Sequence, residues 1–281
     1  TMRLAVPSKG RLREGTLVLL RDAGLQFEST DRALAVPVRN ADLELLFVRT
    51  DDIPELVTDG VADLGITGQD LLAEYGADLP ELVELGYGKC RLVAAVARDD
   101  EAEKLEDLAG RRLATSHPNA TRRALADRSI DATVVALRGS VEVAPKLGVA
   151  DAIVDLVSSG STLLQNDLRE VGTLLASQAV LVATQERAST TDVQRLATSL
   201  SSVVQARRQR YVLLNAPADR VDEVVALMPG LASPTVVPEA STEWVAIHSV
   251  VERDTVWDLL PKLRAAGATG ILVLRIEQMV E

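Results

Sequence analysis

Short apolar runs rich in β-branched residues alternate along most of the chain with stretches that suit helices. The runs lie at residues 4–7, 43–48, 63–67, 92–97, 113–115, 133–137, 152–157 and 180–183. Helix-compatible segments between them include residues 11–23, 53–58 and 121–127. Alternating strands and helices are typical of proteins in which helices cover a mostly parallel sheet. The sequence therefore predicts an α/β fold.

A short internal repeat indicates two similar lobes. The sequence Gly-Val-Ala-Asp begins at Gly60 and again at Gly148, and in both places a predicted strand follows. Four common residues can also recur by coincidence, and that alternative stays open. We expect lobe I at about residues 1–91 and 183–208 and lobe II at about 92–182. A ligand cleft is then expected between them, near the strand ends.

The pattern changes near residue 208, where we expect a domain boundary. Predicted strands at 211–214, 235–237, 244–251 and 270–275 are interleaved with predicted helices at 218–227 and 255–266. This βαββαβ order is that of a ferredoxin-like domain. We therefore expect the two lobes within residues 1–208 and a separate C-terminal domain at 209–281.

Composition and charge argue against several functional classes. A formal net charge of −11 argues against a broad nucleic-acid surface, because phosphate backbones bind concentrated Lys and Arg. Cys90 is the single cysteine, and no signal-like segment precedes the first strand, so a cytoplasmic location is expected. No apolar run is long enough to span a bilayer, so we expect no membrane role. The two histidines lie far apart in sequence, and no protein metal site is expected.

The stretch Asp155-Leu-Val-Ser-Ser-Gly-Ser-Thr-Leu163 runs from a predicted strand into small hydroxyl residues around one glycine. Such a turn can direct backbone N–H groups and hydroxyls at one anion, and Gly160 permits a positive φ. A helix beginning near Thr162 would add its positive end. The turn predicts a phosphate monoester site, and the alternative is an ordinary Ser-Gly turn that caps a helix.

Three cations follow predicted strands where a cleft at strand ends would lie. They are Lys9, Arg11 and Arg49, although cations in such places are also commonly solvated surface residues. The turn that begins at Gly65 and reaches Asp70 offers either a nucleotide contact or a helix cap. Asp155 could accept hydrogen bonds from a ribose diol or hold Mg²⁺ through water, or it could simply be a polar strand end.

Five stretches occur in an order that resembles one enzyme family. They are AVPSKGR at 5–11, GITGQD at 65–70, ATSHPN at 114–119, GSVEVAP at 139–145 and DLVSSGSTL at 155–163. They resemble the ATP phosphoribosyltransferases, and the C-terminal region makes the chain similar to the long, histidine-regulated form. The resemblance implies a two-lobed catalytic region with a periplasmic-binding-protein-like (type II) fold and a regulatory ferredoxin-like domain.

The resemblance also implies the reaction. ATP and 5-phosphoribosyl 1-pyrophosphate would give N1-(5-phosphoribosyl)-ATP and pyrophosphate, the first step of L-histidine biosynthesis, with Mg²⁺ held mainly by substrate phosphates. The residues implied for the phosphoribosyl donor are Glu142, Asp155, Ser158, Ser159, Gly160, Ser161 and Thr162. Those implied for the nucleotide are Arg49, Asp70 and Leu71, and those implied for catalysis are Lys9, Arg11, Arg49 and Asp155.

For the C-terminal domain, the resemblance implies an inhibitory histidine site between neighbouring copies, with Asn215, Thr235 and Gly270. These residues are alternatively core and turn positions of the fold. The resemblance further implies a homo-oligomer, with dimers assembling into a hexamer, and it assigns His117 no catalytic role.

Other functions remain open from the residues alone. A two-lobed solute-binding or effector-sensing protein would share the architecture without turnover. A salvage phosphoribosyltransferase typically has two adjacent acidic residues before its phosphate loop, whereas Leu156 follows Asp155 here. A catalytically inactive regulatory relative is the third alternative.

Overall fold

The computed structural model describes residues 1–28, 33–228, 230, 233–240 and 243–280. The chain forms two compact units, Thr1–Ala197 and Thr198–Glu281. The division falls inside helix α6 (Thr191–Arg208), earlier than the boundary predicted near residue 208. The later part of α6 packs with the C-terminal unit, where the backbone N–H of Met279 donates to the carbonyl of Ser202.

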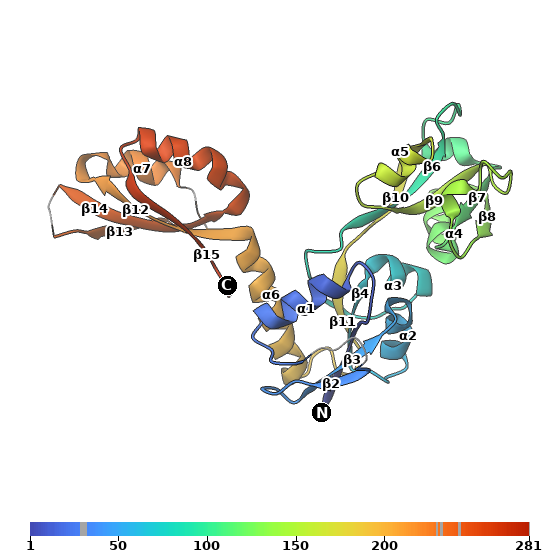
Figure 1. The fold of residues 1–281 in the computed structure, drawn as a ribbon, viewed down its shortest axis with the longest axis horizontal. Helices are drawn as coiled ribbons and strands as arrows, with labels where there is room; N and C mark the ends of the chain where they lie inside the picture. Colours follow the sequence, from blue (N-terminus) through green and yellow to red (C-terminus); the bar gives the residue numbers. More distant parts are fainter. Residues whose placement is uncertain (29–32, 229, 231–232, 241–242, 281) are drawn as a thin grey trace. The chain divides into compact units, whose positions relative to one another are not determined.

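The first lobe of the N-terminal unit is a six-stranded sheet in the order β2-β3-β1-β4-β11-β5 (Figure 1). Strands β1, β3 and β4 run parallel, whereas β11 runs antiparallel to β4 and β5. The strands are β1 (Met2–Pro7), β2 (Ala35–Pro37), β3 (Leu43–Val48), β4 (Leu64–Gly68), β5 (Glu81–Glu84) and β11 (Ala179–Ala183). All five residues of β11 are buried, as expected of a strand between two others.

The place of β11 corrects the predicted lobe limits. Lobe II was expected to extend to residue 182, but β11 belongs to the first sheet. The chain crosses between the sheets twice, after β5 and after Ser177, so the second crossing comes before β11. Among the described residues, the helices α1 (Arg13–Asp22), α2 (Ile53–Thr58) and α3 (Gln69–Tyr75) pack in the first lobe. Pro54 lies in the first turn of α2, where its missing N–H costs no helical hydrogen bond.

The second lobe is a five-stranded sheet in the order β10-β6-β9-β7-β8. Its strands are β6 (Cys90–Ala97), β7 (Arg112–Thr115), β8 (Thr133–Ala136), β9 (Ala152–Val157) and β10 (Leu168–Ser177). Strands β7, β8 and β9 are parallel, and β6 is antiparallel to β9 and β10. Apolar clusters of Leu, Val, Ile and Ala flank this sheet, together with α4 (Pro118–Ala126) and α5 (Ser161–Gln165).

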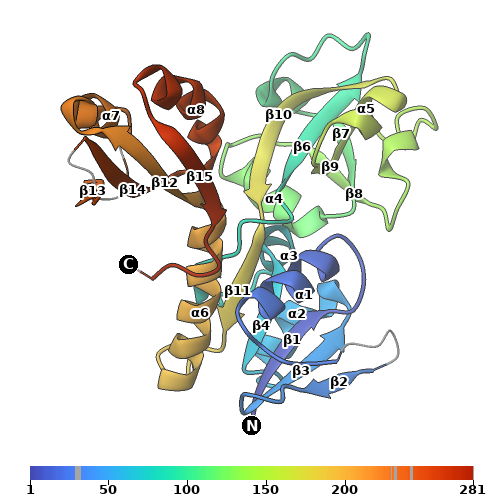
Figure 2. The same ribbon diagram turned by 60° about the vertical axis from the view of Figure 1, so that its left-hand side comes forward.

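The C-terminal unit has the predicted ferredoxin-like order. Its antiparallel sheet runs β13-β14-β12-β15, and α7 (Val221–Leu227) and α8 (Val256–Ala265) lie along one side of it (Figures 1 and 2). The strands are β12 (Gln209–Pro217), β13 (Thr235–Pro238), β14 (Trp244–Glu252) and β15 (Thr269–Arg275). Val212, Leu214, Val224 and Leu263 are fully buried in the core between sheet and helices.

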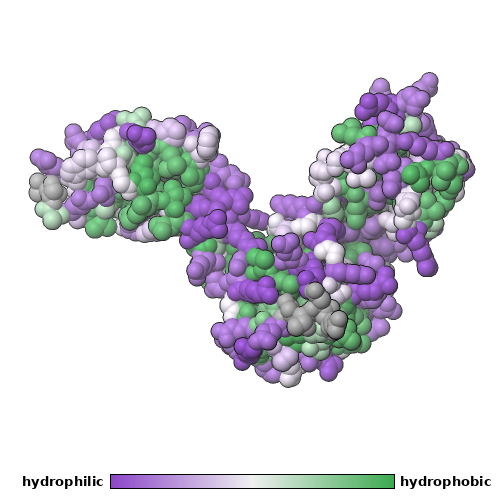
Figure 3. Space-filling view, in the orientation of Figure 1, coloured by the Kyte–Doolittle hydropathy of each residue, from purple (hydrophilic) through white to green (hydrophobic). Residues whose placement is uncertain are grey.

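The other face of this sheet carries uncovered apolar side chains. Val212 points into the core, so its neighbours Tyr211 and Leu213 point to the other face of the sheet. On β15, Tyr211 pairs with Leu274 and Leu213 pairs with Leu272. Leu272 is 53% exposed and Leu274 is 46% exposed. Apolar residues also gather on this unit in the space-filling view (Figure 3). No helix within the described residues is long and apolar enough to cross a membrane.

Candidate active site

The first lobe places two cations after the carboxyl ends of neighbouring strands. Strands β1 and β3 are in register, with Pro7 opposite Val48, and the backbone N–H of Ser8 donates to the carbonyl of Val48 at 2.8 Å. Lys9 and Arg49 therefore follow the two strands at one edge of the sheet. Both are exposed, and neither side chain forms a hydrogen bond or ion pair with another described residue. This edge presents positive charge to an incoming anion.

Arg11 and Asp70 lie at the same edge and form an ion pair. Arg11 Nη2 is 2.9 Å from Asp70 Oδ1, and Arg11 Nη1 donates to the carbonyl of Gly88. Burial acts to raise the pKa of Asp70, but contacts with His117, Ser177 and Arg11 together lower it to about 2. The Asp70 carboxylate is therefore ionised at neutral pH. Sequence reasoning assigned Asp70 to the nucleotide, whereas the structure engages its oxygens with other side chains.

The second lobe brings two predicted carboxyl groups together. Asp155 lies in β9, and Glu142 lies in the short 3₁₀ helix η3 (Val141–Val143) that follows β8. Burial raises the pKa of Asp155, the backbone N–H of Leu156 opposes this through a 2.8 Å hydrogen bond, and the negative charge of Glu142 raises it further. Glu142 is therefore close enough to Asp155 for its negative charge to affect the pKa of that carboxyl.

The predicted phosphate turn follows β9 directly. Gly160 has φ 76°, the left-handed conformation that glycine permits, and it is the N-cap residue of the short helix α5. Around it the hydroxyl residues Ser158, Ser159, Ser161 and Thr162 are all exposed. The hydroxyls of Ser159 and Ser161 are 3.1 Å apart. Ser158 and Ser159 precede α5, whereas Ser161 and Thr162 are its first two residues.

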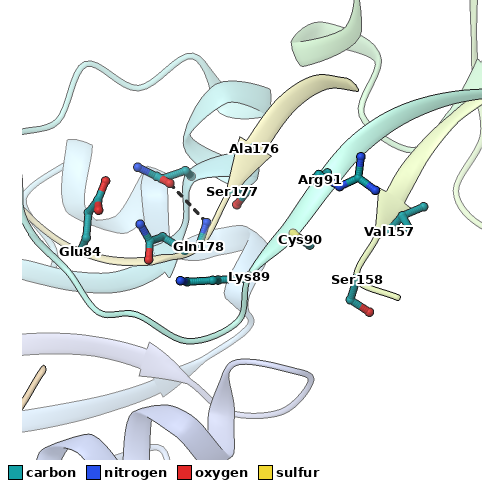
Figure 4. A pocket seen from close by; sticks show the side chains of 10 residues that line it. Glu84, Lys89, Cys90, Arg91, Val157, Ser158, Ala176, Ser177 and Gln178 are labelled. Atoms are coloured by element: carbon teal, nitrogen blue, oxygen red, sulfur yellow. Dashed lines mark hydrogen bonds between the residues drawn. The ribbon is translucent and has the colours of Figure 1, made fainter. Parts of the chain in front are cut away.

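A cavity of about 560 Å³ lies where the crossing segments join the lobes (Figure 4). It is lined by Gln69, Glu84, Lys89, Cys90, Arg91, Val157, Ser158, Ala176, Ser177 and Gln178. Ser158 of the phosphate turn therefore shares a cavity with Gln69 of the first lobe. Sequence reasoning missed the crossing residues around Lys89 and Ser177. A signal was present, because Gly86 and Gly88, both with positive φ, mark a turn just before Lys89.

Two family models match consecutive parts of the chain. One, described as ATP phosphoribosyltransferase, matches residues 49–202, and one described as HisG, C-terminal domain, matches residues 206–278. The first match alone covers more than half of the chain.

The chain belongs to the ATP phosphoribosyltransferase family.

Relatives named ATP phosphoribosyltransferase are similar over nearly the full length. The one from Gemmatimonas aurantiaca is 46% identical and the one from Parabacteroides distasonis is 42% identical, each over 99% of both chains. Among solved structures, the ATP phosphoribosyl transferase (HisG:HisZ) complex from Thermotoga maritima has a TM-score of 0.63 at 28% identity, over 73% of this chain and 99% of that chain. The resemblance seen in the sequence is thus confirmed.

A second solved structure bears on the fold alone. A histidine kinase sensor domain with similarity to periplasmic binding proteins has a TM-score of 0.50 at 16% identity, over 74% of this chain and 90% of that chain. The two-lobed, periplasmic-binding-protein-like fold expected for an ATP phosphoribosyltransferase is therefore confirmed.

In the C-terminal unit, the structure brings together two of the three predicted effector residues. Asn215 lies opposite Thr269 in the β12–β15 pair, and a Cβ on Gly270 would lie 3.7 Å from Asn215 Nδ2. Thr235 is in β13 and pairs with His248 of β14, so a strand separates it from β12. Within one chain, a ligand that touches all three residues would have to extend across that strand.

Proposed function

We propose that this ATP phosphoribosyltransferase joins ATP to 5-phosphoribosyl 1-pyrophosphate, giving N1-(5-phosphoribosyl)-ATP and pyrophosphate, the first step of L-histidine biosynthesis. One observation carries the proposal. In this member of the family, the two lobes present different groups at the ends of their strands. The first lobe presents exposed Lys9 and Arg49, and the second presents the hydroxyl turn at Gly160. Such a pair of edges suits two polyanionic substrates.

On the donor side, the turn from Ser158 to Thr162 would hold the 5-phosphate through backbone N–H groups and hydroxyls. Glu142 and Asp155 would lie beside the ribose. As the bond from the anomeric carbon to pyrophosphate breaks, its electron pair leaves with pyrophosphate and positive charge develops on the ribose. Nearby carboxylates stabilise that charge, and the adenine N1 lone pair forms the new bond.

On the other side of the reaction, Lys9 and Arg11 would face the departing pyrophosphate. Arg49 and Leu71 would line the nucleotide site, next to the segment that contains Asp70. The nucleophile and the leaving group are already competent, so no covalent enzyme intermediate is required. Catalysis then rests on positioning two substrates and on cations that stabilise the leaving charge.

The carboxyl groups present fit Mg²⁺ as the cofactor. Within the described residues, no group of three or more His, Cys, Asp or Glu side chains is placed to hold a metal ion. Mg²⁺ commonly binds through one or two carboxylates together with substrate phosphates. Asp155 and Glu142 are the neighbouring pair that could supply those carboxylates. When bound, the ion would neutralise negative charge on the pyrophosphate.

The experiment that tests the reaction is a direct assay of product formation. ATP, the donor and Mg²⁺ are mixed with the protein and pyrophosphatase, and phosphoribosyl-ATP is followed by ultraviolet absorbance. We expect product to form and to require both substrates. Binding of either substrate with no product at any protein concentration would instead favour a two-lobed binding protein.

We further propose histidine inhibition and self-assembly for the C-terminal unit. The adjacency of Asn215 and Gly270 supports a small-molecule site at the β12–β15 edge. The uncovered sheet face with Leu272 and Leu274 supports assembly with other copies, because exposed apolar patches commonly mark interfaces. Repeating the assay with L-histidine tests the first point, and light scattering of the intact protein tests the second, with a hexamer expected.

A further inference from the structure

The carboxylate of Asp70 is contacted by three segments that are far apart in the chain. Arg11 Nη2 and the hydroxyl of Ser177 lie 2.9 Å and 2.6 Å from Asp70 Oδ1. The same hydroxyl accepts the backbone N–H of Asp70 at 3.0 Å. His117 Nε2 lies 3.6 Å from Asp70 Oδ2, and His117 Nδ1 is 3.0 Å from the hydroxyl of Ser116. The contacts thus come from the segment after β1, from the end of crossing strand β10, and from the start of α4 in the second lobe.

This cluster is buried. The side chain of Asp70 is 2% exposed, and Ser177 and His117 are 5% and 8% exposed. An ionised carboxylate removed from water is costly unless other groups pair with it. Here each oxygen faces a partner, so the carboxylate is fixed in one place. Little of its surface is left for a nucleotide.

Arg11 differs from its partners because its side chain is 39% exposed. The bonds to Asp70 and to the Gly88 carbonyl anchor one side of the planar guanidinium. A guanidinium has more N–H donors than these two bonds use, so others remain for an anion. Two fixed points on a planar group also set its orientation.

A second contact holds α3 and α4 together beside the cluster. The carboxylate of Glu74 in α3 accepts the backbone N–H groups of Asn119 and Ala120 at 2.9 Å and 2.8 Å, at the start of α4. His117 immediately precedes α4, so its position near Asp70 is set by the same docking of helices. His117 also lies within electrostatic range of Asp155 on the donor side.

We propose that Asp70, Ser177 and His117 are positioning residues that hold the Arg11 guanidinium toward the pyrophosphate of the donor. The proposal rests on the proposed function, in which Arg11 faces that group. Asp70 binds the guanidinium from the first lobe, and Ser177 at the end of β10 binds Asp70. His117 makes this arrangement depend on the second lobe, which holds the donor phosphate. The buried carboxylate therefore acts on the substrate through Arg11.

A double-mutant cycle tests this chain of contacts in the full-length protein. Asp70→Asn should lower kcat/KM for the donor up to about 100-fold, since small misplacements of a catalytic group have effects of that size. In an Arg11→Ala background the same change should have almost no further effect, because Arg11 is the group through which it acts. Equal losses from Asp70→Asn in both backgrounds would overturn the proposal.

Milder and matched variants separate positioning from folding. Ser177→Ala removes one hydroxyl and should lower kcat/KM for the donor, but less than Asp70→Asn does. Ser177→Thr keeps the hydroxyl and should have kcat/KM for the donor close to that of the wild-type protein. Asp100→Asn is the matched control, because Asp100 pairs with Arg111 at 2.7 Å in a half-buried ion pair away from the cavity. That variant should lose stability without a donor-specific effect. A loss of donor kcat/KM in Asp100→Asn equal to that in Asp70→Asn would contradict a positioning role.

Calorimetric binding of the donor measures the same cycle without turnover. If the wild-type protein binds the donor but forms no product, the proposed function fails while the coupling between Asp70 and Arg11 can still be measured as a loss of affinity. If the wild-type protein forms product but the cycle is additive in both assays, only the positioning proposal fails.

Discussion

Replacing Gly160 with valine isolates the contribution of one backbone conformation to donor binding. Gly160 has φ 76°, and a Cβ built on it would meet nothing within 4 Å. The Cβ itself therefore adds no clash, and we expect the effect to come mainly from the conformation. A non-glycine residue held in a sparsely populated region costs about 1–3 kcal/mol, with a β-branched side chain toward the upper end.

In the valine variant, the free turn should relax to another conformation, and donor binding must then restore the original one. The cost of restoration subtracts from the binding energy, so donor affinity should fall roughly fivefold to 150-fold. Gly160→Asn should lose less, because asparagine tolerates positive φ better than valine does. Isothermal calorimetry with the donor measures these affinities directly.

Gly110 provides the matched control for this prediction. It lies in the same lobe with φ 75°, and a Cβ there also meets nothing within 4 Å. Gly110→Val should therefore cost similar stability in thermal unfolding and leave donor affinity unchanged. If Gly160→Val loses stability as Gly110→Val does but binds the donor as tightly as wild type, the turn does not hold the phosphate.

Three further predictions address the ion pair, the effector site and the assembly face. The pKa of Asp70 is lowered from 3.8 to about 2, so its pairing stabilises the fold by about 2 kcal/mol above pH 3.8, and this is lost as pH falls through 2. Asp70→Asn should thus lower the free energy of unfolding in urea at pH 7 but have little effect near pH 2, and equal losses at both would contradict this. Asn215→Ala should raise the histidine concentration needed for half-inhibition at least about tenfold, because the ligand loses a hydrogen-bonding partner; an unchanged dose response would place the effector elsewhere. Leu274→Glu should reduce the oligomer mass measured by light scattering, since a charge at an apolar interface is costly, and an unchanged mass would exclude this face from assembly.

Strands that are continuous apolar runs could be predicted from the sequence, whereas the short strands β2 and β5 and the irregular strand β10 were not. Buried runs such as β6 and β9 are continuous stretches of Val, Leu, Ile and Ala, so they stand out at once. Strand β10 was missed because its burial does not alternate regularly. Its pairing with β6 shifts register between Glu170 and Gly172 and again between Thr173 and Leu175. Each irregularity breaks the period of two on which sequence reasoning depends.

The Gly-Val-Ala-Asp repeat could be recognised in the sequence because its four residues are consecutive. Gly60 and Gly148 have φ 70° and 68°, and each is followed by a strand. The carboxylate of Asp63 accepts the backbone N–H of Arg3 at the start of β1, and that of Asp151 accepts the backbone N–H of Arg112 at the start of β7. In both lobes the aspartate thus ties the beginning of its own strand to a parallel neighbour. The repeat is a shared structural device, and chance is no longer needed to explain it.

The Asp70 cluster is the opposite case, because the sequence contains its residues but does not show that they are in contact. Asp70 is 59 positions from Arg11 and 107 from Ser177. No local pattern links such residues, because they meet only after both sheets form and the chain crosses between them. Read alone, Asp70 resembled a helix cap or a nucleotide contact, since an acidic residue in a first helical turn fits either. Burial decides between such readings, and burial depends on tertiary packing. Sequence motifs can therefore suggest candidate substrate-binding segments, whereas the contacts among residues far apart in the chain are found only in the folded chain.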